Sequence, residues 1–283
     1  MAHTTEMTIS VVIPVHNNVR LALRALGSVL RQERAVHEVI LVDDASNAAN
    51  RATLGRAVAR CRSTIPIRVE YLDVNAGPGM ARHIGAGLAQ GTYIAFLDAD
   101  DRWHQSKTAL SESAISNLGA QLLGHNRPWS FSVKSRTLVD LPPSVQYRAL
   151  SRSAFLRRNP IPTSSIVASR DIAQEMFRFG GRKAEDFMAL MIASGMADRI
   201  VFIEADLCWA PKPPFGFSGE GADQLHIYSS SLSHMRFLQK EGLVTSKELT
   251  IFTTILLFKV PIGMLRLLRY RTLLTSRKIG RKS

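Results

Sequence analysis

The chain has 283 residues, of which 46% are hydrophobic and 21% charged, enough for one large packed domain with extensions or for two small domains. Its two cysteines, Cys61 and Cys208, fit neither a disulfide framework nor a CxxC metal site. Near the N-terminus a seven-residue apolar run is interrupted by Pro14, where a secreted protein would carry a signal sequence. These features predict a globular protein in the cytoplasm.

The formal net charge of +13 is unevenly distributed. Eight of the basic residues lie between Lys259 and the C-terminus, a segment without any acidic residue, so the rest of the chain is only mildly basic. Nucleic-acid binders usually spread positive charge and aromatic residues over a broad face. The distribution here disfavours a nucleic-acid partner.

Short segments rich in Val, Ile and aromatic residues alternate with segments of helical spacing over the first hundred residues. Strands are predicted over residues 8–15, 37–44, 67–73 and 92–98, and helices over residues 18–33, 47–62 and 77–91. Strands that are apolar throughout are typical of a sheet covered on both faces. The pattern therefore predicts an α/β fold with a parallel sheet.

Beyond residue 104 the pattern is less regular. Helices are predicted over residues 106–119 and 184–195, and strands over residues 129–135, 163–169 and 199–205. The Pro/Gly-rich segment 210–221 is a candidate flexible flap that would close over a bound ligand, or a simple solvated loop.

Three carboxylates end one of the predicted buried strands, in the stretch YIAFLDADDRW at residues 93–103. Asp98, Asp100 and Asp101 would repel one another unless a partner neutralises them, and Mg²⁺ and Mn²⁺ prefer oxygen ligands of this kind. A solvated turn that caps the next helix is the alternative, so this motif alone is weak. Because parallel sheets bind ligands beyond the carboxyl ends of their strands, the residues after the other strands are candidates as well.

Four segments, in this order, resemble the inverting, nucleotide-sugar-dependent glycosyltransferases of family 2. They are SVVIPVHNN at 10–18, VILVDDAS at 39–46, NAGPGMARHIGAGLAQGTYIAFLDADD at 75–101 and AEDFMAL at 184–190. The resemblance is strong over residues 8–107, moderate to about residue 220 and weak beyond. One departure is Gln105, where many relatives carry proline.

The resemblance implies a GT-A fold, with a single Rossmann-like, mainly parallel sheet flanked by helices and a C-terminal helical extension. The catalytic domain would span residues 1–220. Within it, residues 8–107 would form the nucleotide-sugar-binding half and residues 108–220 the acceptor half. Residues 221–283 would be a helical, basic extension and a candidate for membrane association.

The resemblance also implies how the nucleotide-sugar donor is bound. Asp44 would accept a hydrogen bond from the ring N–H of uracil, which favours a UDP-sugar while leaving GDP and dTDP donors open. Pro14 and His16 would flank the base. Arg82 would reach the base or the phosphates, and its alternative is a surface arginine on the first turns of a helix.

For the chemistry, the resemblance implies a metal site and a general base. Asp98 would hold the ribose hydroxyls or a metal-bound water, and Asp100 would ligate the Mn²⁺ or Mg²⁺ that bridges the two phosphates. Asp186 would be the base and Glu185 an orienting residue, although acidic residues are common in the first turn of any helix. The hydroxyls of residues 163–165 are candidate sugar ligands or backbone caps.

Together these features predict a metal-dependent inverting glycosyltransferase, moving a hexosyl or N-acetylhexosaminyl group to a hydroxyl of a glycan or lipid-linked acceptor in surface polysaccharide biosynthesis. One alternative is transfer to polyprenyl phosphate, which needs no base because the acceptor is already an anion. Another is a non-catalytic nucleotide-sugar-binding module, against which the intact set Asp44, Asp98, Asp100 and Asp186 argues.

The C-terminal segment is apolar first and basic afterwards. Residues 249–268 have nearly the length of a membrane helix, but Lys259, Pro261 and Arg266 interrupt them. The pattern instead favours a helix that lies in the membrane interface, with its basic residues in contact with lipid phosphates. Such a helix would place the protein peripherally on the inner face of the cytoplasmic membrane. A helix packed on the catalytic domain is the alternative.

Overall fold

A mixed β-sheet carries most of the structure, a computed structural model that describes residues 7–127, 141, 144–157, 159–181, 184–210 and 224–258. The chain divides into two units, Met1–Gly216 and Phe217–Ser283, and each is described by itself. The strand expected at residues 129–135, the flap after Ala210 and the basic tail after residue 258 lie outside the described residues.

The first part of the sheet is parallel, as the sequence predicts. Its strands, in spatial order, are β3 (Ile67–Leu72), β2 (Glu38–Asp44), β1 (Ile9–Val15) and β4 (Tyr93–Phe96). They alternate along the chain with α1 (Val19–Val29), α2 (Ala48–Ala59) and α3 (Pro78–Leu88). The chain crosses from β1 to β2 on one side and returns to β4 on the other, so the carboxyl ends of these strands flank a crevice of the kind in which open sheets bind ligands.

Alternate residues of β1 pack against opposite layers. Val11 and Ile13 belong to a core cluster with α1 and α4 (Lys107–Leu118), whereas Val12 faces α3. At Gly85 of α3 a Cβ atom would lie 2.4 Å from a methyl carbon of Val12, so α3 approaches the sheet more closely than any other residue would permit. α3 therefore has a fixed position over the crevice.

The second part of the sheet contains antiparallel strands, which the sequence did not predict. Beyond β4 the order continues with β8 (Val167–Ser169), β6 (Leu122–Asn126), β9 (Ile200–Asp206) and β7 (Tyr147–Leu150). β8 is antiparallel to β4 and β6, and β7 is antiparallel to β9. A separate ribbon pairs β5 (Arg102–Trp103) with β10 (Cys208–Trp209).

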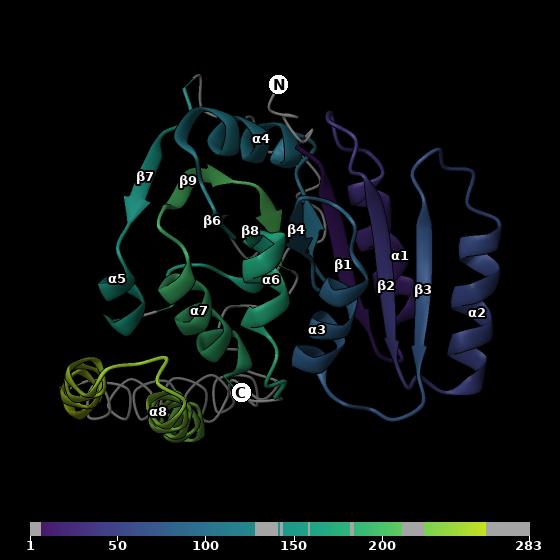
Figure 1. Ribbon diagram of the computed structural model, residues 1–283. Coiled ribbons are helices and arrows are strands. Elements are labelled where there is room, and N and C mark those ends of the chain that lie inside the picture. The colour runs from purple at the N-terminus through teal and green to yellow at the C-terminus, as the bar shows by residue number, and fades with distance from the viewer. Residues whose placement is uncertain are drawn as a thin grey trace, which may run out of the picture. The chain divides into compact units, whose positions relative to one another are not determined.

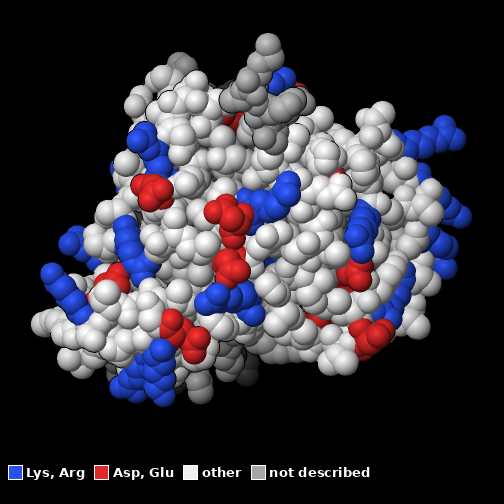
Figure 2. Space-filling model, viewed as in Figure 1, with Lys and Arg blue, Asp and Glu red and all other residues white. Residues whose placement is uncertain are grey.

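Helices cover both faces of this sheet. In Figure 1, α3, α6 (Arg170–Met176) and α7 (Glu185–Met196) lie side by side on one face, and α5 (Arg152–Arg157) packs beside α7. The segment 163–169, expected as one strand, is a 3-10 helix, η1 (Thr163–Ser165), followed by β8. On the face shown in Figure 2, acidic side chains near the centre of the first unit lie beside basic ones.

The second unit contributes two helices, joined by a short turn, to the described residues. It contains α8 (Gln224–Lys240) and a helix over residues 246–258, which begins with a capping box between Thr245 and Glu248. At the end of that helix Leu257 and Phe258 are 69% and 72% exposed. Among the described helices, none is both long and apolar enough to cross a bilayer.

Candidate active site

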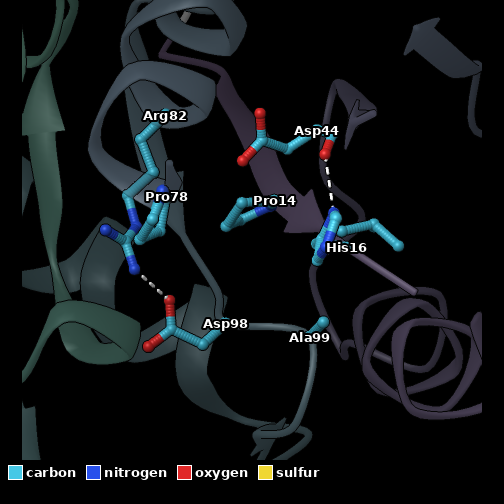
Figure 3. Close-up of a pocket in the computed structure, with 8 residues that line it drawn as sticks. Pro14, His16, Asp44, Pro78, Arg82, Asp98 and Ala99 are labelled. Carbon is cyan, nitrogen blue, oxygen red and sulfur yellow. Dashed lines mark hydrogen bonds and ion pairs between the residues drawn. The ribbon is translucent and has the colours of Figure 1, made fainter. Parts of the chain in front are cut away.

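A cavity of about 190 Å³ opens at the carboxyl ends of β1, β2 and β4 (Figure 3). Its lining residues are Pro14, Val15, His16, Asp44, Pro78, Arg82, Asp98 and Ala99. Five of the six residues expected to bind the nucleotide sugar are among them. The sixth, Asp100, is not one of these lining residues. Residues from separate strand–helix units thus meet at the edge of the sheet where the sequence places the ligand.

Asp44 holds the loop that leads into α3. Its Oδ1 accepts a hydrogen bond of 2.7 Å from the N–H of Ala76, and its Oδ2 accepts one of 2.9 Å from the N–H of Gly77. Gly77 has a φ of 91°, a conformation that glycine adopts readily. A carboxylate has about four lone-pair sites, so these two bonds leave acceptor capacity for a ligand. The structural role of Asp44 in the loop is one that sequence reasoning missed.

His16 is fixed at the end of β1 by hydrogen bonds with Asp44, Asn17 and Asn75. Its Nδ1 lies 2.7 Å from the backbone oxygen of Asp44, and because a carbonyl oxygen only accepts, Nδ1 carries the proton. The side-chain amide of Asn17 then donates to Nε2 over 2.9 Å. Figure 3 shows the imidazole beside Pro14 in the wall of the cavity.

Arg82 is buried, with only 4% of its surface exposed, so the alternative of a surface arginine is wrong. Its Nη2 lies 2.5 Å from Oδ1 of Asp98 and its Nη1 lies 3.4 Å from Oε1 of Glu185. The guanidinium also stacks 5.2 Å from the ring centroid of Phe177. Burial disfavours its charge, but Asp98 and then Glu185 outweigh that effect and hold the pKa of Arg82 above its usual value.

Two arginines relieve the repulsion in the acidic stretch after β4. Asp101 is fully buried and accepts two hydrogen bonds from Arg127, of 2.5 Å and 2.9 Å. Burial still raises the pKa of Asp101 to about 6. Burial also disfavours ionisation of Asp98, but Arg82 reverses this and lowers the pKa of that carboxyl below its usual value. Arg127 follows β6, a strand that was not predicted, so no local sequence signal indicates its role.

The residues present fit a divalent cation that arrives with a diphosphate. Among the described parts of the chain, no group of three or more His, Cys, Asp or Glu side chains is arranged to hold a metal by itself. Mg²⁺ and Mn²⁺ commonly use one or two carboxylates together with substrate phosphates. Asp98 is the carboxylate of the acidic stretch that lines the cavity, and a cation bound there would share it with Arg82.

The two acidic residues at the start of α7 face different partners. Glu185 pairs with Arg82, and burial raises the pKa of Glu185 above its usual value by more than Arg82 lowers it. Asp186 accepts a hydrogen bond of 3.0 Å at Oδ2 from the amide nitrogen of Asn159, and one of 2.8 Å at Oδ1 from the N–H of Phe187. The structure therefore distinguishes the two carboxylates, and Asn159 is a neighbour that sequence reasoning missed.

In η1 the hydroxyls of Ser164 and Ser165 bond to backbone groups. Ser164 accepts a hydrogen bond of 3.0 Å at Oγ from the N–H of Asp98, and Ser165 donates one of 2.7 Å to the carbonyl of Pro162. Both serines are at most 1% exposed. The structure thus favours the cap over the sugar ligand for these two residues, and it gives Ser164 a part in positioning the acidic stretch.

Known proteins show the same fold. The computed structure superposes on that of the mannosyltransferase PcManGT of Pyrobaculum calidifontis in complex with GDP-Man and Mn²⁺, with a TM-score of 0.60, 15% identity, and coverage of 95% of this chain and 81% of that one. TarS 1-349 of S. aureus in complex with UDP-GlcNAc gives a TM-score of 0.60 and 18% identity, covering 81% of this chain and 66% of that one. These structural neighbours confirm the predicted GT-A architecture.

Relatives by sequence point to one enzyme class. The amylovoran biosynthesis glycosyltransferase AmsB of Erwinia amylovora is 29% identical over 215 residues, which is 71% of this chain and 69% of AmsB. The succinoglycan biosynthesis protein ExoO of Rhizobium meliloti is 35% identical over 200 residues, covering 67% of this chain but only 56% of ExoO. The family model described as "Glycosyl transferase family 2" matches residues 10–157. As the sequence predicted, the chain belongs to glycosyl transferase family 2, a family of transferases.

Proposed function

We propose that this protein is a metal-dependent inverting glycosyltransferase that transfers a sugar from a nucleoside diphosphate sugar to a hydroxyl of a glycan or lipid-linked acceptor in surface polysaccharide biosynthesis. The observation that carries the proposal is the meeting of Pro14, His16, Asp44, Arg82 and Asp98 in one cavity at the edge of the sheet. The names of AmsB and ExoO support the polysaccharide context.

The donor enters between β1 and α3 in this proposal. Pro14 and the fixed ring of His16 flank the base, and the spare lone pairs of Asp44 accept a hydrogen bond from a ring N–H. Because Asp44 already holds the loop before α3, base recognition and loop geometry depend on the same carboxylate. UDP is the favoured nucleotide, as in the TarS complex, while the PcManGT complex contains GDP-Man.

The leaving diphosphate requires positive charge. Asp98 and Asp100 would hold Mn²⁺ or Mg²⁺, which as a Lewis acid neutralises charge on the leaving group. Ser164 and Arg82 fix Asp98 from its backbone and its side chain, respectively. The chain thereby presents a preorganised carboxylate to the cation.

The acceptor hydroxyl must lose its proton as it attacks the anomeric carbon. We assign this proton to the carboxylate of Asp186, because Glu185 is paired with Arg82 and is held for orientation. A single displacement with one base on the opposite side of the sugar from the leaving group inverts the anomeric configuration. Asn159 holds the base carboxylate in place.

A peripheral position on the inner face of the cytoplasmic membrane belongs to the same proposal. Leu257 and Phe258 expose apolar surface at the end of the helix over residues 246–258. In the sequence they directly precede the basic tail. Apolar side chains followed by basic residues are the combination that binds an anionic membrane surface.

The proposal is tested by measuring sugar transfer directly. A thermal-shift panel of UDP-glucose, UDP-galactose, UDP-GlcNAc, GDP-mannose and dTDP-glucose, with and without Mn²⁺, selects the donor. The selected donor, labelled in its sugar, is then incubated with lipid-linked and glycan acceptors, and the product linkage is determined by NMR. An inverted linkage supports the proposal. Nucleotide-sugar binding with retention of configuration, or without transfer to any acceptor class, contradicts it.

A further inference from the structure

Arg82 is one cation placed between two carboxylates from opposite sides of the site. Asp98 follows β4 and lines the donor cavity, whereas Glu185 begins α7 and precedes the proposed base. The two ion-pair distances, 2.5 Å to Asp98 and 3.4 Å to Glu185, are unequal. Since all three side chains are largely shielded from water, a change of charge at one carboxylate affects the hold of Arg82 on the other.

The guanidinium of Arg82 is not fully bonded. Its Nε is buried and has no hydrogen-bond partner, and its face stacks on the ring of Phe177. The side chain is therefore held by the two carboxylates and by stacking. Because Nε makes no hydrogen bond, a small shift of the guanidinium from one carboxylate towards the other loses no bond at that atom.

The backbone of α3 also contacts the segment before α7. Gly79 of α3 packs so closely on the segment before α7 that a Cβ atom there would lie 2.9 Å from the carbonyl carbon of Gly180. Gly180 and Gly181 have φ values of 61° and 115°, which favour glycine. α3, which carries Arg82, is thus in direct contact with the segment that leads to Glu185.

We propose that Arg82 couples the donor cavity to the start of α7 by sharing its charge between Asp98 and Glu185. The inference rests on the proposed donor, a nucleoside diphosphate bound with a divalent cation. With Asp98 bound to the cation, Arg82 would be drawn towards Glu185 and would hold the first turn of α7, which carries Asp186, more tightly. Donor binding therefore prepares the acceptor side, and Arg82 acts as a positioning residue for the base.

The coupling predicts an effect at a distance on nucleotide affinity. In the Glu185→Gln variant Arg82 has only Asp98 as its anionic partner, so it competes more strongly with the cation. We expect the affinity for UDP in the presence of Mn²⁺, measured by titration calorimetry, to fall about fivefold. Asp186→Asn is the matched control, because it removes one negative charge from the neighbouring position, where the carboxylate makes no described ion pair with Arg82. It should change that affinity by less than about twofold.

A double-mutant cycle tests whether the effect passes through Arg82. In an Arg82→Gln background, Glu185→Gln should no longer alter the affinity for UDP and Mn²⁺. Hydrogen exchange gives an independent readout: UDP with Mn²⁺ should slow exchange in peptides covering residues 184–190 of the wild type by severalfold, and should not do so in Glu185→Gln. If Arg82→Gln does not fold, the comparison of Glu185→Gln with Asp186→Asn and the exchange measurement still decide.

The outcomes separate the coupling from the proposed function. If UDP or another nucleotide of the panel binds with Mn²⁺ but Glu185→Gln and Asp186→Asn weaken binding equally, the coupling is wrong and the donor site stands. The same holds if the cycle is additive or the 184–190 peptides do not respond. If no nucleotide binds the wild type with or without a cation, both the coupling and the proposed function are wrong.

Discussion

Asn159 donates a hydrogen bond of 3.0 Å from its side-chain amide to Oδ2 of Asp186. The amide can face Asp186 in only one orientation, because its own oxygen accepts a hydrogen bond of 3.1 Å from the N–H of Ile161. With Oδ1 of Asp186 bonded to the N–H of Phe187, the carboxylate plane is fixed by two donors. The proposed base is thus held in position before any acceptor binds.

Replacing Asp186 by Asn should retain donor binding and reduce sugar transfer by roughly 10²–10⁴-fold, the usual contribution of a general base. The loss arises because an amide cannot take the proton of the acceptor hydroxyl. Rates of transfer and calorimetric donor affinities of wild type and variant measure the two effects. Turnover near the wild-type rate would place the base elsewhere or indicate a phosphate acceptor, as in transfer to polyprenyl phosphate.

Asn159→Ala should lower kcat about fivefold to tenfold with little change in the KM for donor, since one hydrogen bond of about 1 kcal/mol to the base is lost. In the Asp186→Asn background the same substitution should have no further effect on transfer. Steady-state kinetics of the four proteins give this cycle. An equal loss in both backgrounds would mean that Asn159 only stabilises the fold.

Lys107 should make stability depend on pH. Its amine is 1% exposed and 4.3 Å from the ring centroid of Trp103, and burial lowers the pKa of Lys107 to about 7. The folded chain then binds fewer protons than the unfolded chain above pH 7, so stability rises with pH between the folded pKa and the unfolded value near 10.5. Stability from this group is lost as the pH falls towards 7.

Lys107→Met keeps the apolar stem and removes the amine. Between about pH 7 and pH 8.5 the free energy of unfolding of the wild type should rise by about 1 kcal/mol per pH unit relative to this variant. Denaturant unfolding at several pH values measures the difference. Burial lowers the pKa of the neighbouring His125 well below its usual value and raises the pKa of the Cys208 thiol well above its usual value, so neither group of the wild type changes its charge between pH 7 and pH 8.5. Parallel pH curves would show that Lys107 stays charged.

Removing residues 249–283 should abolish salt-sensitive binding to vesicles that contain anionic phospholipid. The deletion removes the exposed apolar side chains and eight basic residues, each worth about 1 kcal/mol near an anionic surface. Transfer to a membrane acceptor should then fall far more than transfer to a soluble analogue. Co-sedimentation with vesicles at low and high salt measures binding.

A matched variant separates apolar from electrostatic attraction. Leu257→Ser with Phe258→Ser leaves every basic residue of the tail in place, adds no charge and removes the exposed apolar surface. It should weaken vesicle binding while preserving its salt dependence. Full-length protein that stays in the supernatant at low salt would contradict the membrane contact, and loss of the fold on truncation would favour a packed helix.

Much of the donor side could be predicted from the sequence, because each residue follows a strand of the repeated parallel pattern. Asp44 is the last residue of β2 and Asp98 follows β4. Because the carboxyl ends of parallel strands meet at one edge of the sheet, the two carboxylates lie in the same cavity. Motif resemblance supplied Arg82 but not its partners. Its burial between Asp98 and Glu185 depends on how closely α3 approaches the sheet and the segment before α7.

The acceptor side could not be predicted to the same extent. Arg127 neutralises Asp101 only because β8 is inserted antiparallel between β4 and β6, and local hydrophobic patterns carry no information on that order. Residues 163–165 have the composition of a strand start, but the hydroxyls of Ser164 and Ser165 bond to backbone groups and favour a 3-10 turn. Long-range partners of this kind follow from topology.

In the proposed function the acidic stretch after β4 binds a cation carried by a nucleoside diphosphate. Calorimetric titration of UDP into wild type, Asp100→Ala and Asp198→Ala, each with Mn²⁺ and with chelator, tests it most directly. Asp198 lies in an exposed position after α7 and is the control for loss of one acidic charge. We expect Mn²⁺-dependent UDP binding in the wild type and in Asp198→Ala, and its loss in a folded Asp100→Ala. Undiminished metal-dependent affinity in Asp100→Ala would contradict the account.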